Sequence, residues 1–381
     1  MLNASVVITT YNGKKQIQAC LLSLNHQILK QDESFNVVVV DDGSDDGTDE
    51  VIGKLRLNYD CKYLYKERTP TSSRAAARNM GIRHCDGDII IFLDGDQIVG
   101  PTFIQEHLRS HRWNRDIVVV GLRNYLSPGT IDLGKLARSF SPDNLPPVQK
   151  SDGRCQVFAR FSENLGFIRT AWHLGYSCNV SVRKAHLDRV GYFNEGFIGW
   201  GLEDCELMFR LCQAGLRMVL NKHALTYHQY HESAWNESKY QQWYENLKYF
   251  ISLHPQPEVS LQILLDSFFD PKKRQQPWID YYERFELSVR KHKNEPVWER
   301  EKICYLVNSN QRAITEIVAE IAKHSPEQIV VVIDDAVHSD LDVVIQTLEE
   351  APWLQYFSVP DEERKIHLLN HFVRNVPKLH L

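Results

Sequence analysis

The sequence predicts an α/β protein with a mostly parallel, doubly wound sheet flanked by helices, followed by a mainly helical carboxyl-terminal region. Short apolar runs rich in β-branched residues recur over the first 120 residues, and stretches with helical spacing separate the first four of them. Prolines 255 and 257 precede a change in composition. Because 381 residues exceed what a single core usually supports, we expect two domains.

The predicted strands are residues 5–9, 35–40, 62–65, 89–93 and 117–120. Helical spacing predicts helices over residues 14–29, 74–84 and 102–112, the first with an inward face that includes Ile17 and Ile28. Strands that alternate with helices imply right-handed crossovers, and ligands then bind at the carboxyl ends of the strands.

The pattern breaks over residues 123–170, where prolines and glycines are frequent and no period persists, so an irregular, mobile insertion is expected. Regular spacing returns at about Gly175 and predicts a helix over 202–216 and a strand over 218–220. A domain boundary is expected at 254/255. Residues 255–381 should be mainly helical, with one strand at 329–333.

Composition limits the partners. The formal net charge of −5 disfavours nucleic acid as a general ligand. Eight cysteines without a C-x-x-C pair fit free thiols in a reducing compartment. No basic region precedes a long apolar stretch at the start, and the apolar runs are too short for a membrane span. A cytoplasmic protein without a transmembrane segment is therefore expected.

Two carboxylates, Asp94 and Asp96, follow a predicted strand directly and are separated by one glycine. Hard oxygen ligands of this kind hold Mg²⁺ or Mn²⁺ beside a substrate diphosphate. A lone pair of this type is also common in an ordinary polar turn. The pair therefore predicts a divalent cation site only if neighbouring motifs agree.

Other side chains at strand ends are candidates for binding a nucleotide. Asp41 and Asp42 end the second predicted strand, where they could bind a base or ribose. Thr9 and Tyr11 end the first strand, and the ring of Tyr11 could lie against a base. A turn and a structural tyrosine explain these residues nearly as well.

Two arginines precede the strand that leads to the carboxylates. Arg74 and Arg78 are four residues apart on the predicted helix, so they share a face and could meet a diphosphate. A solvated basic face is the alternative, and Arg78 is the better candidate of the two.

The segments VVITTYN, VVVVDDGSDDGT, ARNMGI and GDIIIFLDGD occur in the order and spacing of family 2 glycosyltransferases, which the chain resembles over about residues 4–235. The later segments GYFNEGF and GWGLEDCEL resemble galactosyl- and N-acetylgalactosaminyltransferase domains. The resemblance implies the GT-A fold and a catalytic domain over 1–254. It assigns the nucleotide sugar to 1–122, the acceptor to 171–254 and an accessory role to 255–381.

The resemblance also implies roles for single residues. A single inverting displacement needs one carboxylate as general base, and Asp204 is the candidate. Glu203 would bind a sugar hydroxyl, and Trp200 would offer a flat wall to a sugar ring. His228 would complete the metal site, with His231 as the alternative. Negative charge in the first turn of a helix is favoured in any case, which explains the acidity without a catalytic role.

Three other functions compete with an inverting glycosyltransferase. A retaining transferase of the same fold usually has Asn where this chain has Asp204. A nucleotidyltransferase would need a glycine-rich loop after the first strand, and a non-catalytic sugar or peptide binder could lose the metal carboxylates. The expected donor is a UDP-linked hexose or N-acetylhexosamine, with Mn²⁺ or Mg²⁺ as cofactor. The acceptor (saccharide, peptide or small glycoside) and the oligomeric state stay open.

Overall fold

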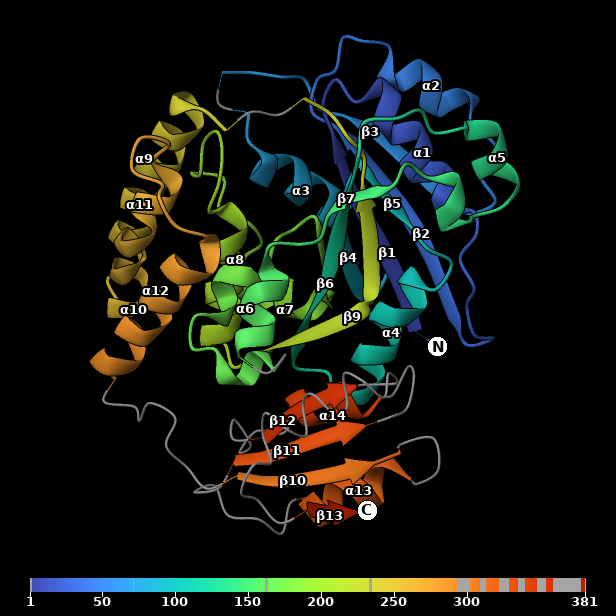
Figure 1. Cartoon of the computed structure of the whole chain (residues 1–381). Helices are drawn as coiled ribbons and strands as arrows, with labels where there is room; N and C mark the ends of the chain where they lie inside the picture. Colours follow the sequence, from blue (N-terminus) through green and yellow to red (C-terminus); the bar gives the residue numbers. More distant parts are fainter. Residues whose placement is uncertain are drawn as a thin grey trace.

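The computed structural model describes residues 2–70, 72–161, 164–232, 235–293, 302–308, 313–321, 329–334, 340–347, 354–358 and 378–380. Within these residues, one large mixed sheet is flanked by helices on both faces, and a smaller parallel sheet lies beside one end of it (Figure 1). No helix in these ranges is long and apolar enough to cross a membrane. The cysteines described are all unpaired.

The large sheet has the strand order β3-β2-β1-β4-β8-β6-β9-β5, with β7 paired to β6. Strands β1 to β4 are mutually parallel, whereas β8 runs antiparallel between β4 and β6. The bounds of the strands are β1 Leu2–Thr10, β2 Glu33–Asp41, β3 Cys61–Tyr65, β4 Ile89–Asp94, β5 Gln97–Val99, β6 Ile117–Leu126, β7 Val148–Lys150, β8 Asn179–Arg183 and β9 Arg217–His228. The predicted mostly parallel sheet is confirmed.

The central strands are apolar on both sides because both faces of the sheet are covered. Along β1, Val6 and Ile8 pack into one core, whereas Val7 between them packs into the other. Val37 and Val38 of β2 divide in the same way. A continuous apolar run is therefore the correct pattern for these strands, as in other parallel sheets with helices on both sides.

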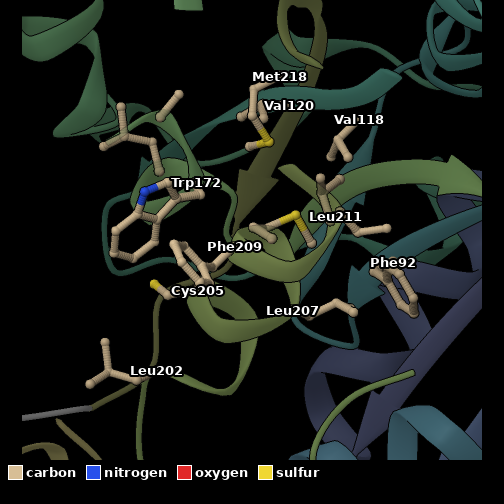
Figure 2. Packing of buried hydrophobic residues seen from close by; sticks show 14 of the residues in the cluster. Phe92, Val118, Val120, Trp172, Leu202, Cys205, Leu207, Phe209, Leu211 and Met218 are labelled. Atoms are coloured by element: carbon tan, nitrogen blue, oxygen red, sulfur yellow. The ribbon is translucent and has the colours of Figure 1, made fainter. Parts of the chain in front are cut away.

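Helices α1, α2 and α4 cover one face, and α3, α8, α9 and α12 contribute to the core on the other. Figure 2 shows part of the second core, in which Phe209 of α8 lies beside Trp172, with ring centroids 5.3 Å apart. The bounds of these helices are α1 Lys14–Leu24, α2 Thr48–Lys54, α3 Arg74–Arg83, α4 Phe103–Trp113, α8 Glu203–Gln213, α9 Glu237–Leu253 and α12 Trp278–His292.

Two expectations about helix ends had different outcomes. The helix predicted over 14–29 ends at Leu24, and Ile28, predicted to face inward, is 59% exposed in the following loop. Gly215 has a φ of +95° after α8. This left-handed conformation suits glycine and ends the helix where the sequence predicted.

The insertion at 123–170 is more regular than predicted. Strand β6 continues to Leu126 instead of ending near residue 120, and short elements follow it: α5 Leu133–Arg138, β7 Val148–Lys150 and α6 Arg154–Arg160. Arg154, almost fully buried, fixes part of this segment. Its guanidinium is held by the Asp152 carboxylate and donates to the backbone carbonyls of Gly121 and Leu174. Such contacts between distant segments leave no periodic signal in the sequence.

The carboxyl-terminal region combines helices with a second sheet. Helices α10 Pro257–Ser260, α11 Asp266–Phe269 and α12 follow α9, which confirms the predicted helical carboxyl-terminal part. The described residues from 302 onward add a four-stranded parallel sheet in the order β12-β11-β10-β13, of which the sequence predicted only one strand. Its elements are β10 Lys302–Val307, α13 Ile314–Ile321, β11 Ile329–Asp334, α14 Leu341–Thr347, β12 Leu354–Ser358 and β13 Lys378–His380. β11 confirms the strand predicted at 329–333.

The small sheet is joined to the large one through α14. The side-chain amide of Gln346 accepts from the backbone N–H of Leu220 at 2.8 Å and donates to its carbonyl at 3.1 Å. The amide thus makes the two backbone hydrogen bonds with Leu220 that a neighbouring strand would make at this point of β9. Asp340 forms an ion pair with Arg109 of α4, and Val343 packs against Ile117 and Val219.

Residues 257–292 share the core of the first domain. Val259, Leu265, Tyr282 and Phe285 are fully buried in the same cluster as Phe92 of β4. We therefore propose that the catalytic unit extends to about residue 293, beyond the boundary predicted at 254/255.

Replacing Phe285 by alanine tests this proposal. Truncating a fully buried aromatic side chain typically costs about 3–5 kcal/mol, so Phe285→Ala should lower the free energy of unfolding by that amount. Ile263→Ala is the matched control, because Ile263 lies in the same segment but is 43% exposed, and about 0.5 kcal/mol or less is expected. Urea unfolding followed by tryptophan fluorescence measures both. Equal, small losses would show that this segment is not part of the catalytic core.

Candidate functional site

A cavity of about 940 Å³ opens at the carboxyl ends of the central strands. Side chains from the end of β1, the turn after β4, the start of α3 and the start of α8 line it, together with residues of α9. The predicted residues that line it are Thr9, Tyr11, Asp42, Arg74, Arg78, Asp94, Asp96, Trp200, Glu203, Asp204 and His231.

Strand register brings the predicted motifs together. Thr10 of β1 lies beside Asp41 of β2, and Thr9 lies beside Asp94 of β4. After Asp94 the chain turns through Gly95 and Asp96 into β5, whose first residue, Gln97, pairs antiparallel with His228 of β9. The β5–β9 pairing therefore places the second carboxylate of the motif beside the histidine segment.

Asp96, His228 and His231 form a three-residue cluster. The Nε2 atoms of His228 and His231 lie 3.4 and 3.2 Å from Oδ2 of Asp96, and the donor atoms of all three lie within 4.8 Å of one another. The sequence left open which histidine belongs to the site, and the structure brings both to it. Asp94 is outside this cluster, and its Oδ1 lies 3.4 Å from Arg78.

The cluster shifts the pKa of each member. Burial opposes ionisation of Asp96, but the hydrogen bond with His231 and the charges of both histidines lower its pKa overall. Burial lowers the pKa of His228, whereas the hydrogen bond to Asp96 raises that of His231. An ionised carboxylate beside two imidazole groups is a donor set for a divalent cation. The two imidazoles suit a transition metal such as Mn²⁺ better than Mg²⁺.

Arg78 connects the end of β4, at Asp94, with the start of α8, the helix that carries the predicted base Asp204. Its Nη1 donates to Oε1 of Glu203 at 2.9 Å, and its Nη2 lies near Asp94. Arg78 and Glu203 are only 4% and 6% exposed. Burial alone would lower the pKa of Arg78, but the charges of Glu203, Asp94 and Asp204 raise it, so the guanidinium stays charged.

Asp204 lines the cavity, and each of its two carboxylate oxygens accepts a hydrogen bond from a backbone N–H. Its Oδ1 accepts from the N–H of Cys205 at 2.8 Å, and its Oδ2 accepts from the N–H of Ser177 at 3.3 Å. Burial and the adjacent charge of Glu203 raise its pKa to about 6, and Arg78 acts in the opposite direction. A carboxylate with this pKa is ionised at neutral pH yet basic enough to accept a proton.

The loop before α8 is held in a strained form by α9. Gly199, Gly201 and Leu202 have φ values of +79°, +96° and +73°, a region that only glycine adopts easily. Asn246 of α9 donates to the backbone carbonyls of Ile198 and Gly201. The two glycines of GWG therefore meet a conformational need, which the charge preference of a helix start does not explain.

The aromatic wall of the cavity is larger than predicted. Trp200 lines the cavity and meets Trp235 edge-on, with ring centroids 4.7 Å apart. The rings of Trp243 and Phe269 stack on each other with centroids 4.3 Å apart, and both residues also line the cavity. All except Trp200 come from residues 235–269, in which the sequence analysis singled out no individual binding residue.

The predicted nucleotide-binding residues divide into two groups. Asp42 lines the cavity and pairs with Lys66 and Arg68 at 2.8 and 2.6 Å, and Arg68 stacks 3.8 Å from the centroid of Tyr11. Asp41 is not among the described residues that line the cavity. Its carboxylate is almost fully buried and accepts from the N–H of Ser44 and the hydroxyl of Tyr63. It shapes the loop that carries Asp42.

Several cavity residues were missed by the sequence analysis. Arg123 lies on the extension of β6, Tyr176 precedes the strand β8, and Gln242 lies on α9. Arg123 had one available signal, because a lone arginine follows the apolar run 117–122 where a strand end could face a ligand. Tyr176 and Gln242 lie in segments without a motif, so only the tertiary structure places them.

Two family models match the chain. Glycosyl transferase family 2 matches residues 5–171, and a second model, described as the N-terminal domain of galactosyltransferase, matches residues 158–232. Together they include every predicted catalytic and metal residue.

Curated relatives share about 30% identity. The chain is 29% identical over 61% of its length to the uncharacterized glycosyltransferase YfnE of Bacillus subtilis, and 31% identical over 66% to validoxylamine A glucosyltransferase of Streptomyces hygroscopicus. It is 28% identical over 59% to hyaluronan synthase of Pasteurella multocida. The matches span 66%, 56% and 24% of these relatives, respectively.

Among solved structures, Staphylococcus aureus TarS in complex with UDP-GlcNAc is similar with a TM-score of 0.47 and 18% identity, covering 76% of this chain and 92% of that one. A mannosyltransferase of Pyrobaculum calidifontis, in complex with GDP-Man and Mn²⁺, has a TM-score of 0.46 and 13% identity, covering 85% and 81%.

The two model matches make residues 5–232 similar to glycosyltransferases, and the sheet order and the carboxylates after β4 lie within this range. Residues 5–171 match family 2 of the glycosyltransferases, and an overlapping galactosyltransferase-like segment covers residues 158–232.

Removing the Asp96 carboxylate tests the metal site. Asp96→Asn should weaken Mn²⁺ binding at least tenfold, because loss of even an outer partner of a metal ligand typically costs about 10–100-fold. Free Mn²⁺ can be followed by electron paramagnetic resonance. Asp49→Asn, on the exposed surface of α2, controls for the loss of one negative charge. Equal Mn²⁺ affinity in both variants would remove Asp96 from the site.

Proposed function

We propose that this chain transfers a hexose or N-acetylhexosamine from a UDP-sugar to an acceptor by a single inverting displacement, with Asp204 as general base. The observation that carries the proposal is the position of Asp204. It is a half-buried carboxylate with a raised pKa, lining the same cavity as Asp94 and Asp96.

The donor side of the proposal rests on the ends of β1 and β2 and on α3. Tyr11 and Asp42 line the cavity where a base and ribose would lie, and Thr9 borders Asp94. Arg68 and Tyr11 stack on each other, so a base would have to take the place of the guanidinium against the ring. The galactosyltransferase-like match over 158–232 and the glucosyltransferase among the relatives support a hexose as the transferred sugar.

We assign the divalent cation to Asp96, His228 and His231, with Asp94 nearby. When bound, the cation would offset the negative charge that develops on the leaving nucleoside diphosphate. The imidazole pair makes Mn²⁺ the better candidate of the two predicted ions.

The chain's own residues would carry the proton transfer. Asp204 would accept the proton of the acceptor hydroxyl, with its Oδ1 held by the N–H of Cys205 and its Oδ2 by the N–H of Ser177. Glu203, fixed by Arg78, keeps the pKa of Asp204 high and would bind a sugar hydroxyl with its remaining acceptor capacity. A retaining mechanism would not require a base at this position.

We further propose that the acceptor lies against the aromatic wall of Trp200, Trp243 and Phe269. Flat apolar rings stack on sugar faces, and Gln242 on α9 adds a polar group beside them. A saccharide acceptor fits this wall better than a peptide does.

Calorimetric titration with nucleotide sugars tests the function directly. UDP-glucose, UDP-galactose, UDP-N-acetylglucosamine and GDP-mannose are titrated with Mn²⁺ present and again with chelator. Metal-dependent binding of a UDP-sugar is expected. Absence of binding to any of them would favour a non-catalytic binder over an enzyme.

Asp204→Asn separates donor binding from chemistry. The substitution keeps the shape of the side chain but removes the base, so donor affinity should be unchanged while transfer falls by at least about 100-fold. Glu245→Gln, 65% exposed on α9, is the matched control and should keep the rate of the wild type. Transfer by Asp204→Asn at a near-normal rate would remove Asp204 from the mechanism.

The pH profile tests the same residue. Transfer requires ionised Asp204, so the rate should fall about tenfold per pH unit below its pKa of about 6 and level off above it. The charge of Glu203 raises this pKa, so Glu203→Gln should move the midpoint to lower pH. A midpoint that stays in place in this variant would contradict the assignment of the titration to Asp204.

A further inference from the structure

One partly buried cation in the cavity is not explained by the proposed mechanism. Arg123 lies near the end of β6 and lines the cavity. Its Nη1 donates to Sγ of Cys178 at 3.1 Å, and a thiol sulfur is a weak acceptor. Its Nε is buried without a hydrogen-bond partner. The guanidinium therefore lacks the strong acceptors that a buried arginine normally requires.

Asp152 contacts the backbone of Arg123 but forms no ion pair with its guanidinium. Asp152 accepts the backbone N–H of Arg123 at 3.2 Å, but its carboxylate is bound by Arg154 at 2.6 Å. The rings of Tyr125 and Tyr176 lie 5.1 and 5.7 Å from the guanidinium carbon. Aromatic faces stabilise a cation but accept no directed hydrogen bonds of the kind that a guanidinium fork makes.

Other arginines of the cavity differ from Arg123. Arg78 is paired with Glu203 and Asp94, and Arg68 is paired with Asp42. Arg74 is exposed at the start of α3, where water can solvate its charge. Arg123 combines partial burial, with an Nε atom shielded from water, and the lack of a carboxylate partner within the described residues.

The position of Arg123 indicates which part of a substrate it would meet. Cys178, its hydrogen-bond partner, follows Ser177, whose N–H holds Asp204. On the other side, the ring of Tyr125 lies 5.0 Å from that of His228. Arg123 thus lies between the base and the metal ligands, where the reacting end of the donor must be.

We propose that Arg123 binds an oxyanion of the bound substrate at the reacting end of the cavity. The inference rests on the proposed function, because it takes the cavity to be a donor site. Guanidinium groups bind phosphate and carboxylate in the same two-pronged way. The oxyanion is therefore either the donor's phosphate or a carboxylate on its sugar, as in a uronic acid.

Arg123→Met separates a binding role from a structural one. A buried charge without a partner destabilises the unliganded protein, so replacing it by an apolar side chain of similar length should leave the melting temperature equal or higher. A structural arginine would give the opposite result. A variant that melts lower or fails to fold would overturn the proposal.

Calorimetry with three probes then identifies the oxyanion. UDP, UDP-glucose and UDP-glucuronate are titrated into wild type, Arg123→Met and Arg123→Lys with Mn²⁺ present. Loss of hydrogen bonds to a charged group predicts about 10–100-fold weaker binding to Arg123→Met. Arg123→Lys should recover only part of this, because an ammonium keeps the charge but not the planar fork. Arg160→Gln, an exposed arginine of α6, is the matched control.

Each outcome is decisive. An equal loss for all three probes assigns the phosphate, and a loss confined to UDP-glucuronate assigns a sugar carboxylate. Affinities of Arg123→Met within twofold of wild type for every probe overturn the inference. If wild type itself binds none of the probes, the proposed function has failed instead.

Discussion

The arrangement of the site depends on the buried ion pair between Arg78 and Glu203. Arg78 comes from α3, which precedes the strand of the metal carboxylates, and Glu203 begins α8 in the galactosyltransferase-like segment. Two charges this far from water are tolerated only when each satisfies the other. The pair therefore fixes the distance between the donor half and the half that carries Asp204. The next residue, Asn79, strengthens the same connection by bonding both the N–H and the carbonyl of Phe193.

This pair also sets the electrostatics of the proposed base. Glu203 raises the pKa of Asp204, and Arg78 limits the rise because it lies close to both carboxylates. The result for Asp204 is a pKa of about 6, the intermediate value that its proposed role as a base at neutral pH requires.

The helices after the family match complete the cavity. Both family models end by residue 232, yet α9 holds the strained GWG loop through Asn246, and Phe269 contributes to the aromatic wall. The helix α12 buries Phe285 in the same core as the sheet. This extension thus forms a part of the cavity that neither family model includes, whereas Asp94, Asp96, Glu203 and Asp204 lie within the matched region.

Much of this architecture follows from the sequence alone. Apolar runs, helix periodicity and Gly215 fixed the alternating α/β order, because burial on both faces and helix termination act over a few neighbouring residues. The carboxylates after β4, the GWG turn and the histidine segment were recognisable for the same reason. The tertiary structure decided the contacts between segments distant in sequence. It paired Asp96 with both histidines through the β5–β9 register, directed Asp41 into its own loop, and brought Arg123 between Asp204 and the cluster of Asp96 and the two histidines. It also formed a parallel sheet from the described residues between 302 and 380, where the sequence predicted a single strand. Strand pairing and ion pairing depend on which surfaces meet after folding, and no local pattern of residues records that.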